Sequence, residues 1–323
     1  MFDTRTQFHE YPDVEGFARY DVEIASSEMP SGASWLANCL LELDVALWKP
    51  WGADLREDWQ SLGERRFRYV RSDEAWRRLL PSLEAGREFQ FRATPVPRMT
   101  HAWPGTYGPV ARTILFVRDP RDALHSLWHR ARRIKLVPAD ESFERFLADP
   151  WFHYPVSRAD YLAFWLRVWR VALAGREHLI VRYEDYRRDA LGTLQRATAF
   201  LGLTATPAQL QAAVAASDYQ VAREAEARLI DAGTVDAVFN RAGCAEEWRR
   251  AFDPDMHRAV GSRFAALYDW LGYAPDASGQ ARPGKVVDPA WIDSMLVAAQ
   301  ADQWPDDQRA RLRCYFTAAC TGP

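Results

Sequence analysis

The chain has 323 residues, of which 48% are hydrophobic and 13% aromatic, and its formal net charge is −3. This composition supports a large folded core and excludes an intrinsically disordered chain. A net charge so close to zero gives no indication of binding to nucleic acid or to an acidic membrane surface.

Three further features of the sequence indicate the cellular compartment of the protein and the residues available for binding anions. The four cysteines, Cys39, Cys244, Cys314 and Cys320, show no metal-ligand spacing. No uncharged run approaches the length of a membrane span, and the first ten residues lack the apolar run of a signal peptide. We therefore expect a reduced, cytoplasmic protein. Because the only lysines are Lys49, Lys135 and Lys285, contacts to anions should fall mainly to arginine or backbone amides.

Residues 21–44 are typical of a strand, a tight loop and the start of a helix. Val22 and Ile24 suit a short buried strand, and Pro30 and Gly32 indicate a turn. From Ala33 onward, apolar residues recur at helical spacing. Such a helix start presents unpaired backbone N–H groups and the positive end of the helix dipole, which predicts an anion-binding site. No Gly-Lys-Ser/Thr follows the turn, so this is not an ATP-type P-loop.

The next part of the chain alternates irregular segments with short strands. We expect a Trp-, Pro- and Gly-rich loop region over residues 47–64 and a long irregular loop over 95–109 that contains His101. Strands are expected at 66–70, 88–94 and 113–117, the last of them covered on both faces. A helix capped by Ser72 or Asp73 is expected to run to Leu83.

From Pro120 onward helices predominate. They are expected at 120–133, 143–147, 160–174, 190–201, 207–215, 222–229 and 254–271, with one more strand at 179–182. Strands alternating with helices predict an α/β fold with three layers, a parallel sheet flanked by helices on both faces. We expect one domain over residues 1–273, a linker over 274–287, and a small C-terminal helical appendage over 288–323, with helices at 288–302 and 305–320.

Three later segments also point to an anion or a nucleotide. Arg118 follows a buried strand, where α/β sheets bind ligands, and Ser126 lies on the helix that follows it. Tyr183 again stands at the end of a strand, and residues 241–243 (Arg-Ala-Gly) suit a loop that closes over a ligand. Arg118 could instead pair with Asp122, and each segment alone could be an ordinary turn.

Together these segments resemble the sulfotransferases that use 3′-phosphoadenosine 5′-phosphosulfate. Residues 30–36 (Pro-Ser-Gly-Ala-Ser-Trp-Leu) resemble the family's 5′-phosphosulfate loop, and residues 118–122 (Arg-Asp-Pro-Arg-Asp) with Ser126 resemble its 3′-phosphate motif. Residues 183–185 (Tyr-Glu-Asp) resemble its next block. Residues 241–249, with Arg-Ala-Gly and then Trp-Arg, resemble a degenerate form of its Arg-Lys-Gly loop. The resemblance covers residues 22–273 and implies the P-loop-like sulfotransferase fold.

The resemblance implies a role for each matched residue. The loop would hold the 5′-phosphosulfate, aromatic side chains would contact the adenine, and the later segments would bind the 3′-phosphate. The implied cofactor-binding residues are Ser31, Gly32, Ala33 and Ser34 for the phosphosulfate, Trp35, Tyr183 and Tyr219 for the adenine, and Arg118, Ser126, Arg241, Ala242 and Gly243 for the 3′-phosphate.

The sequence departs from the family's pattern at both chemical positions. The family's loop Lys, which stabilises charge on the bridging oxygen, falls on Pro30, and Arg92 is the candidate to replace it. The family's catalytic His falls on Thr94, and His101 in the same expected loop is the preferred candidate base. Lesser candidates for the base are His125, His129, Glu28 and Asp54.

The predicted function is transfer of a sulfuryl group from 3′-phosphoadenosine 5′-phosphosulfate to a hydroxyl of a small-molecule acceptor, leaving adenosine 3′,5′-bisphosphate. No cluster in the sequence requires a metal. The acceptor is expected to be apolar or aromatic, such as a natural product or a phenol, and bordered by residues 47–64 and 95–109. Nucleic acid and membrane are not expected as partners, and a homo-oligomer is left open. The alternatives are a catalytically impaired nucleotide-binding scaffold and a P-loop nucleotide kinase.

Overall fold

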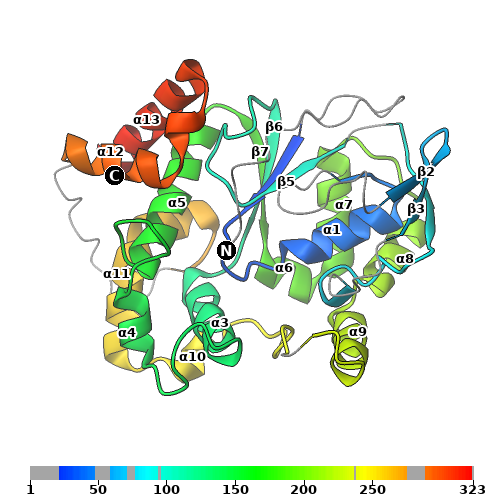
Figure 1. Cartoon of the computed structure of the whole chain (residues 1–323), viewed down its shortest axis with the longest axis horizontal. Coiled ribbons are helices and arrows are strands. Elements are labelled where there is room, and N and C mark those ends of the chain that lie inside the picture. Colours follow the sequence, from blue (N-terminus) through cyan, green and yellow to red (C-terminus); the bar gives the residue numbers. More distant parts are fainter. Residues whose placement is uncertain are drawn as a thin grey trace.

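A four-stranded parallel sheet lies at the centre of the molecule (Figure 1). The structure, a computed structural model, describes residues 22–47, 59–70, 77–93, 96–235, 238–274 and 288–321. The strand order is β5-β1-β6-β7, and all three pairings are parallel. The strands are β1 (Val22–Ser26), β5 (Arg98–Thr100), β6 (Arg112–Val117) and β7 (Glu177–Arg182).

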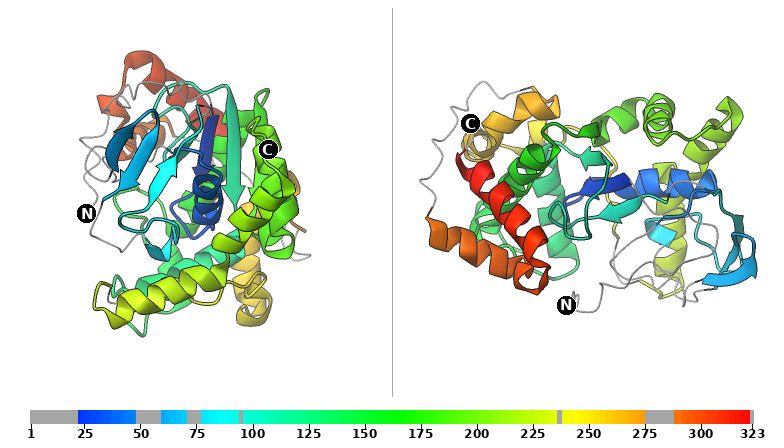
Figure 2. Two further views of the ribbon diagram at one scale, coloured as in Figure 1. Left: turned by 90° about the vertical axis from the view of Figure 1, so that its right-hand side faces the viewer. Right: turned by 90° about the horizontal axis from the view of Figure 1, so that it is seen from above.

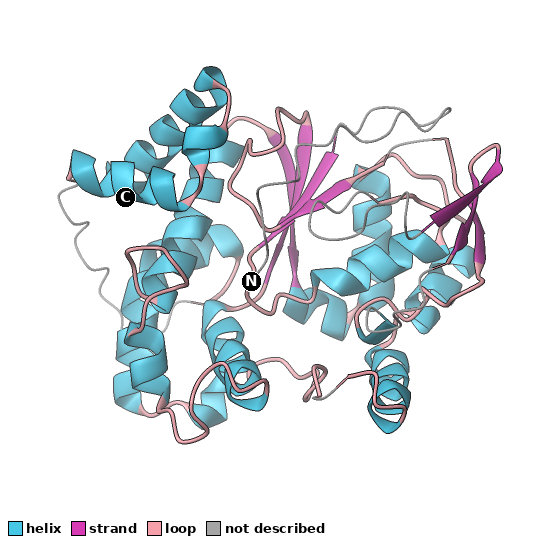
Figure 3. Cartoon of the chain, viewed as in Figure 1, coloured by secondary structure: helices cyan, strands magenta, loops and turns pink. Residues whose placement is uncertain are grey.

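The sheet is covered on both faces, which explains the continuous apolar runs of its inner strands. In β6, Ile114 and Phe116 belong to one apolar cluster, whereas Leu115 and Val117 belong to the other. Successive side chains of a strand point to opposite faces, so the two clusters lie on opposite sides of the sheet. Figure 3 shows helices on both sides of the strands. The predicted three-layer α/β fold is therefore confirmed.

Each face has its own set of helices. One cluster receives side chains from α1 (Ala33–Glu42), α6 (Tyr183–Arg188), α7 (Ala190–Phe200) and α8 (Pro207–Ala216). The other receives side chains from α3 (Pro120–Arg133), α4 (Phe143–Ala148), α5 (Arg158–Leu173), α10 (Trp248–Ala251) and α11 (Pro254–Leu271). A further helix, α9 (Tyr219–Asp231), follows α8. The helices predicted in this region are present, whereas the short helices α6 and α10 were not predicted.

A small antiparallel sheet was missed in the sequence. It has the order β2-β3-β4, with β2 at Trp59–Gly63, β3 at Arg66–Tyr69 and β4 at Glu88–Gln90. The prediction of an irregular region over 47–64 is therefore wrong at its end, and the predicted strand 88–94 is shorter and lies outside the main sheet. Within the described residues 77–83 there is also no α-helix, contrary to the prediction.

The strand β5 corrects the sequence prediction that matters most for the site. Residues 95–109 were predicted to be irregular, but Arg98–Thr100 forms a parallel edge strand next to β1. The strand is short and contains a charged residue, so it shows neither apolar run nor alternation. That residue, Arg98, is fully buried and forms an ion pair of 3.0 Å with the buried Glu23 on β1. As a result, His101 follows a strand directly at the edge where β1 ends.

The two predicted C-terminal helices are present and pack on the main body. They are α12 (Pro289–Ala298) and α13 (Asp306–Thr321), separated by a 3₁₀ turn, η3 (Ala301–Gln303). In Figure 2 the red helix α13 lies beside α5, and α12 packs on α13. The Phe316 ring on α13 meets Trp103 edge-on at 4.8 Å. The division into domain, linker and appendage stays a prediction. No helix of the described part is long and apolar enough to span a membrane.

Candidate nucleotide-binding site

The loop between β1 and α1 leaves the first turn of α1 without a side-chain cap. The N-cap is Gly32, with a left-handed φ of 86°, and no side chain accepts a hydrogen bond at the cap position. The Ser31 hydroxyl accepts only a long hydrogen bond, 3.4 Å, from the Ala33 N–H. Backbone N–H groups at such a helix start favour a negatively charged group. The anion site predicted from sequence thus has the required backbone geometry.

Two tyrosines of α6 pack against this loop. A Cβ on Gly32 would lie 2.6 Å from Cδ2 of Tyr183, so only glycine fits there. The ring of Trp35 stacks on Tyr186, with 4.5 Å between centroids and an interplanar angle of 9°. One face of Trp35 is therefore already covered by protein.

Arg118 links the loop to the other predicted segments. It follows β6, and its guanidinium lies 4.3 Å from the centre of the Tyr183 ring. Its Nη2 donates to the Cys244 carbonyl at 3.1 Å, whereas its Nε is buried and has no hydrogen-bond partner in the described structure. The alternative pairing with Asp122 is long, at 3.9 Å. Asp122 instead accepts hydrogen bonds from the backbone N–H groups of Glu246, at 2.6 Å, and Trp248, at 3.0 Å.

The segment 238–247 runs from α9 to α10 past α3, at the bottom of Figure 1. Gly243, with φ 61°, lies flat on Tyr219: a Cβ there would be 2.7 Å from the ring carbons. The Tyr219 hydroxyl donates to the Asn240 carbonyl at 2.9 Å, and the buried Glu226 carboxylate accepts from the backbone N–H groups of residues 239 and 240. Arg241 forms a two-bond ion pair with Glu247. This segment is fixed by specific contacts at both ends.

His101 lies at the carboxyl edge of the sheet, beside the start of the α1 loop. Its Nδ1 is 2.9 Å from the carbonyl oxygen of Ser26 and 3.1 Å from that residue's hydroxyl. A carbonyl oxygen can only accept, so the neutral imidazole that makes this bond carries its hydrogen on Nδ1 and its lone pair on Nε2. The hydrogen bond to this carbonyl favours the tautomer that a proton acceptor at Nε2 needs.

The structure does not bring Arg92 to this region. Its backbone N–H donates to the Asp44 carbonyl at 2.8 Å, and its side chain donates to the Thr204 carbonyl. Asp44 follows the carboxyl end of α1, which is about 15 Å long, so Arg92 lies at the far end of the helix from the Ser31–Trp35 loop. Thr94 lies outside the described residues.

The remaining predicted residues lie where the motifs place them. Ser126 is partly exposed on α3, and Ala242 is exposed in the segment 238–247. Ser34 is partly exposed in the first turn of α1, next to the buried Ala33. The structure thus brings together the 30–36 loop, Arg118, Tyr183, Tyr219 and the segment 238–247, through the contacts described above.

Glu28, in the same loop, has an unusual environment. Its side chain is exposed, whereas its neighbours Ser27 and Met29 are buried. Desolvation by the surrounding protein nevertheless raises the pKa of Glu28 to about 7. Burial raises the pKa of Tyr107, Tyr154 and Tyr161, and the charge of Glu28 makes a smaller contribution in the same direction. These three tyrosines therefore lie near Glu28.

One cluster of metal-ligand residue types lies beside this site. Ligand atoms of His125, His129 and Glu247 lie within 4.8 Å of one another. Burial, followed by the charge of Arg241, lowers the pKa of His129 to about 4, so its imidazole is neutral near pH 7. However, Glu247 is already paired with Arg241, and the charge of this guanidinium opposes the approach of a cation.

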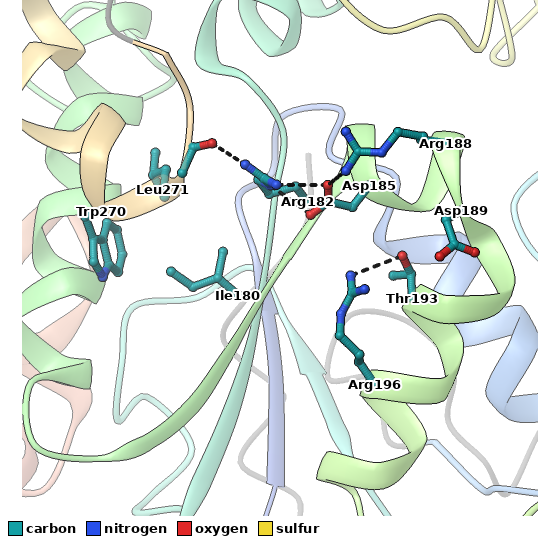
Figure 4. A pocket seen from close by; sticks show the side chains of 10 residues that line it. Ile180, Arg182, Asp185, Arg188, Asp189, Thr193, Arg196, Trp270 and Leu271 are labelled. Atoms are coloured by element: carbon teal, nitrogen blue, oxygen red, sulfur yellow. Dashed lines mark hydrogen bonds and ion pairs between the residues drawn. The ribbon is translucent and has the colours of Figure 1, made fainter.

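The pocket in Figure 4 is a different place, at the exposed edge of the sheet. It has a volume of about 480 Å³ and lies between β7, α6, α7 and the end of α11. Its charges are largely paired with one another: Asp185 accepts from Arg182 and Arg188, and Arg182 also donates to the Gly272 carbonyl. None of the residues predicted to bind the nucleotide lines it.

The fold and site define an α/β protein in which an uncapped helix start and an arginine meet at the carboxyl edge of a parallel sheet, an arrangement that favours anions. The family model described as "Sulfotransferase domain" matches residues 89–272. This match covers more than half of the chain, which therefore belongs to the sulfotransferase family.

Individual relatives agree with this assignment. Sulfotransferase 2A2 and sulfotransferase 2A6, both of Rattus norvegicus, are each 28% identical over 153 and 155 residues, which is 44% of this chain and 51% of each relative. The chain thus spans about half the length of the curated relatives it matches. Among solved structures, mouse sulfotransferase SULT7A1 complexed with PAP is similar in fold, with a TM-score of 0.50, 18% identity, and coverage of 78% of this chain and 86% of that one.

Two residues of this region were missed or underweighted from sequence. Glu28 was only a lesser candidate, because its environment depends on tyrosines far away in the chain. Arg133 was not considered, although it lies seven residues after Ser126 on α3 and so falls on the same helical face. That spacing was the one signal that could have identified it.

Proposed function

We propose that this protein transfers a sulfuryl group from 3′-phosphoadenosine 5′-phosphosulfate to a hydroxyl of a small-molecule acceptor. The observation that carries the proposal is the contact of Tyr183 with both Gly32 and Arg118. Through it, the start of α1 and the end of β6 share one wall. A nucleotide with anionic groups at its 5′ and 3′ positions fits this arrangement.

In the proposed complex the 5′-phosphosulfate lies on the backbone N–H groups of residues 31–34. Trp35, Tyr183 and Tyr219 contact the adenine, with Tyr186 stacked on one face of Trp35. Arg118, Ser126 and the loop 241–243 bind the 3′-phosphate. Arg241 would then exchange part of its pairing with Glu247 for the phosphate.

The proposed chemistry is an in-line displacement at sulfur. The acceptor oxygen forms a bond to sulfur while the bond from sulfur to the bridging oxygen of the donor breaks. The electron pair of that bond leaves with adenosine 3′,5′-bisphosphate. His101 Nε2 takes the proton of the acceptor hydroxyl, and the Ser26 carbonyl stabilises the resulting imidazolium through Nδ1–H. The reaction requires no metal, and positioning with fixed electrostatics does most of the work.

The acceptor is proposed to bind beside Glu28, at the carboxyl edge of the sheet. Glu28 and the start of α1 follow the carboxyl end of β1, and His101 follows the carboxyl end of β5. Nearby Tyr154, Tyr161 and Trp103 form an aromatic group: the Trp103 Nε1–H donates to the Tyr154 hydroxyl at 2.9 Å, and the two tyrosine rings lie 4.8 Å apart. An aromatic environment of this kind suits an apolar or aromatic molecule that carries a hydroxyl, such as a phenol or a natural product.

Calorimetry tests the binding half of the proposal. Titration with adenosine 3′,5′-bisphosphate and with ATP should show a clear preference for the bisphosphate. Equal affinity for both nucleotides, or a preference for ATP, would contradict the proposed function. The catalytic half is tested by transfer of labelled sulfate from the donor to a panel of phenols and alcohols. One observation favours a catalytically impaired scaffold instead: Arg92 lies far from the loop in which Pro30 replaces the family's lysine. Tight bisphosphate binding without any transfer would establish that alternative.

A further inference from the structure

A group of arginines on and around α3 is short of acidic partners. Within the described structure Arg78, Arg130 and Arg133 form no ion pair, and the Nε atoms of Arg78, Arg118, Arg133 and Arg241 are buried without a hydrogen-bond acceptor. A buried donor without a partner is unfavourable, and more so when it is charged. Such a set of donors is the expected lining of a site for an anion.

The charges near the proposed 3′-phosphate position support this interpretation. Arg118 and Arg241 are the two arginines assigned to the 3′-phosphate, but Asp122 and Glu247 lie beside them. The two positive charges are therefore offset by two carboxylates. A phosphate monoester carries a charge of about −1.5 to −2 near neutral pH. The motif residues alone leave little net positive charge for it, so a further cation is needed.

The three remaining arginines differ in what they contact. The guanidinium groups of Arg130 and Arg78 lie 4.3 Å and 5.4 Å from the centre of the Phe239 ring, so they hold the segment 238–247. Arg133 has no ring contact of this kind in the described structure. Burial and then the charge of the Arg241 guanidinium lower the pKa of Arg133, whereas the Glu226 carboxylate, which accepts hydrogen bonds from the backbone of residues 239 and 240, acts in the opposite direction. Arg133 is therefore the arginine close to Arg241 that is left for a ligand.

The position of Arg133 on α3 agrees with this role. It lies seven residues, about two turns, beyond Ser126 on the same face. Long side chains on a helix extend back toward its N-terminus, so the Arg133 guanidinium is directed toward the turn that carries Ser126 and His129. The neighbouring Arg132 is directed differently: its Nε donates to the Ala139 carbonyl at 2.6 Å, and its guanidinium lies 4.7 Å from the Trp128 ring centre.

We propose that Arg133 is a further ligand of the nucleotide's 3′-phosphate and supplies the positive charge that Ala242 cannot supply in the loop 241–243. This inference rests on the proposed function. It identifies a residue outside the matched motifs that makes the protein selective for a nucleotide phosphorylated at the ribose 3′ position.

The test compares two nucleotides that differ only in this phosphate. Calorimetry with adenosine 3′,5′-bisphosphate and with adenosine 5′-phosphate is run on the full chain and on Arg133→Met, which removes the charge and keeps an unbranched side chain. Affinity for the bisphosphate should fall roughly tenfold to a hundredfold, as one charge-assisted hydrogen bond requires, while affinity for the 5′-phosphate stays the same. Arg132→Met, one residue away, is the matched control and should bind both nucleotides like the parent protein.

Two results would overturn the inference. One is unchanged bisphosphate affinity in Arg133→Met, and the other is an equal loss for both nucleotides, which would mean that Arg133 acts through the fold. Arg133→Lys keeps the charge and so distinguishes loss of the charge from misfolding. Its bisphosphate affinity should lie between those of the parent protein and Arg133→Met. An affinity no better than that of Arg133→Met would contradict the contact. Failure of the proposed function looks different, since the parent protein itself would then show no preference for the bisphosphate.

Discussion

Gly32 lies so close to Tyr183 that a Cβ atom on it would come within 2.6 Å of the ring. The same ring has the Arg118 guanidinium 4.3 Å from its centre. One buried tyrosine therefore sets the distance between the loop at the start of α1 and the arginine at the end of β6.

This packing predicts that Gly32→Ala is damaging for two reasons. The alanine would be strained at φ 86°, and its Cβ would push Tyr183 away. We expect the free energy of unfolding to fall by about 1–3 kcal/mol from backbone strain alone, with an additional loss from the clash. Gly175→Ala is the control, because it has φ 75° but open space around its Cβ. Urea unfolding of both variants measures the difference, and equal losses would show that Tyr183 does not constrain the loop.

Arg118→Ala should affect binding of the 3′-phosphate but not binding of the 5′-phosphate. We expect it to lose most of the affinity for adenosine 3′,5′-bisphosphate and to keep that for adenosine 5′-phosphate, because its buried Nε has no other partner in the described structure. Calorimetry with both ligands measures this. Similar losses for both nucleotides would contradict a role at the 3′-phosphate.

His101→Ala should separate binding from turnover. We expect bisphosphate affinity to be unchanged and the rate of sulfuryl transfer to fall at least about tenfold, since general bases commonly contribute more than this. Single-turnover transfer of labelled sulfate to a phenol gives the rate. An unchanged rate would exclude His101 as the proton acceptor and leave Glu28 as the next candidate at the same edge of the sheet.

The raised pKa of Glu28 predicts how the stability of the folded protein depends on pH. Its pKa is raised from 4.5 to about 7 in the folded protein, so between these values the folded state binds a proton that the unfolded state has lost. Stability should therefore fall as pH rises from about 4.5 to about 7 through this group. Glu28→Gln stays neutral, so its gain in melting temperature over the parent should be larger at pH 8 than at pH 4.5. A gain independent of pH would mean that Glu28 is not desolvated.

Local patterns in the sequence determined much of this protein. The bounds of α3, α7 and α11 and the strand–loop–helix at residues 22–42 follow from caps, prolines and apolar spacing, which act within a few residues. The same local signals missed β5, because three residues with a buried Arg98 show no period and the strand exists only through its pairing with β1.

For the site, the sequence by itself determined which segments carry the chemistry, and the tertiary structure decided which of their side chains meet. The packing places His101 on Ser26 and Tyr183 between Gly32 and Arg118, but leaves Arg92 at the far end of α1. The surroundings of Glu28 and the charge balance around Arg133 likewise depend on residues distant in the chain. Burial and Coulomb interactions act through space, so a pattern along the chain fixes which groups are present and only the fold fixes their distances and charges.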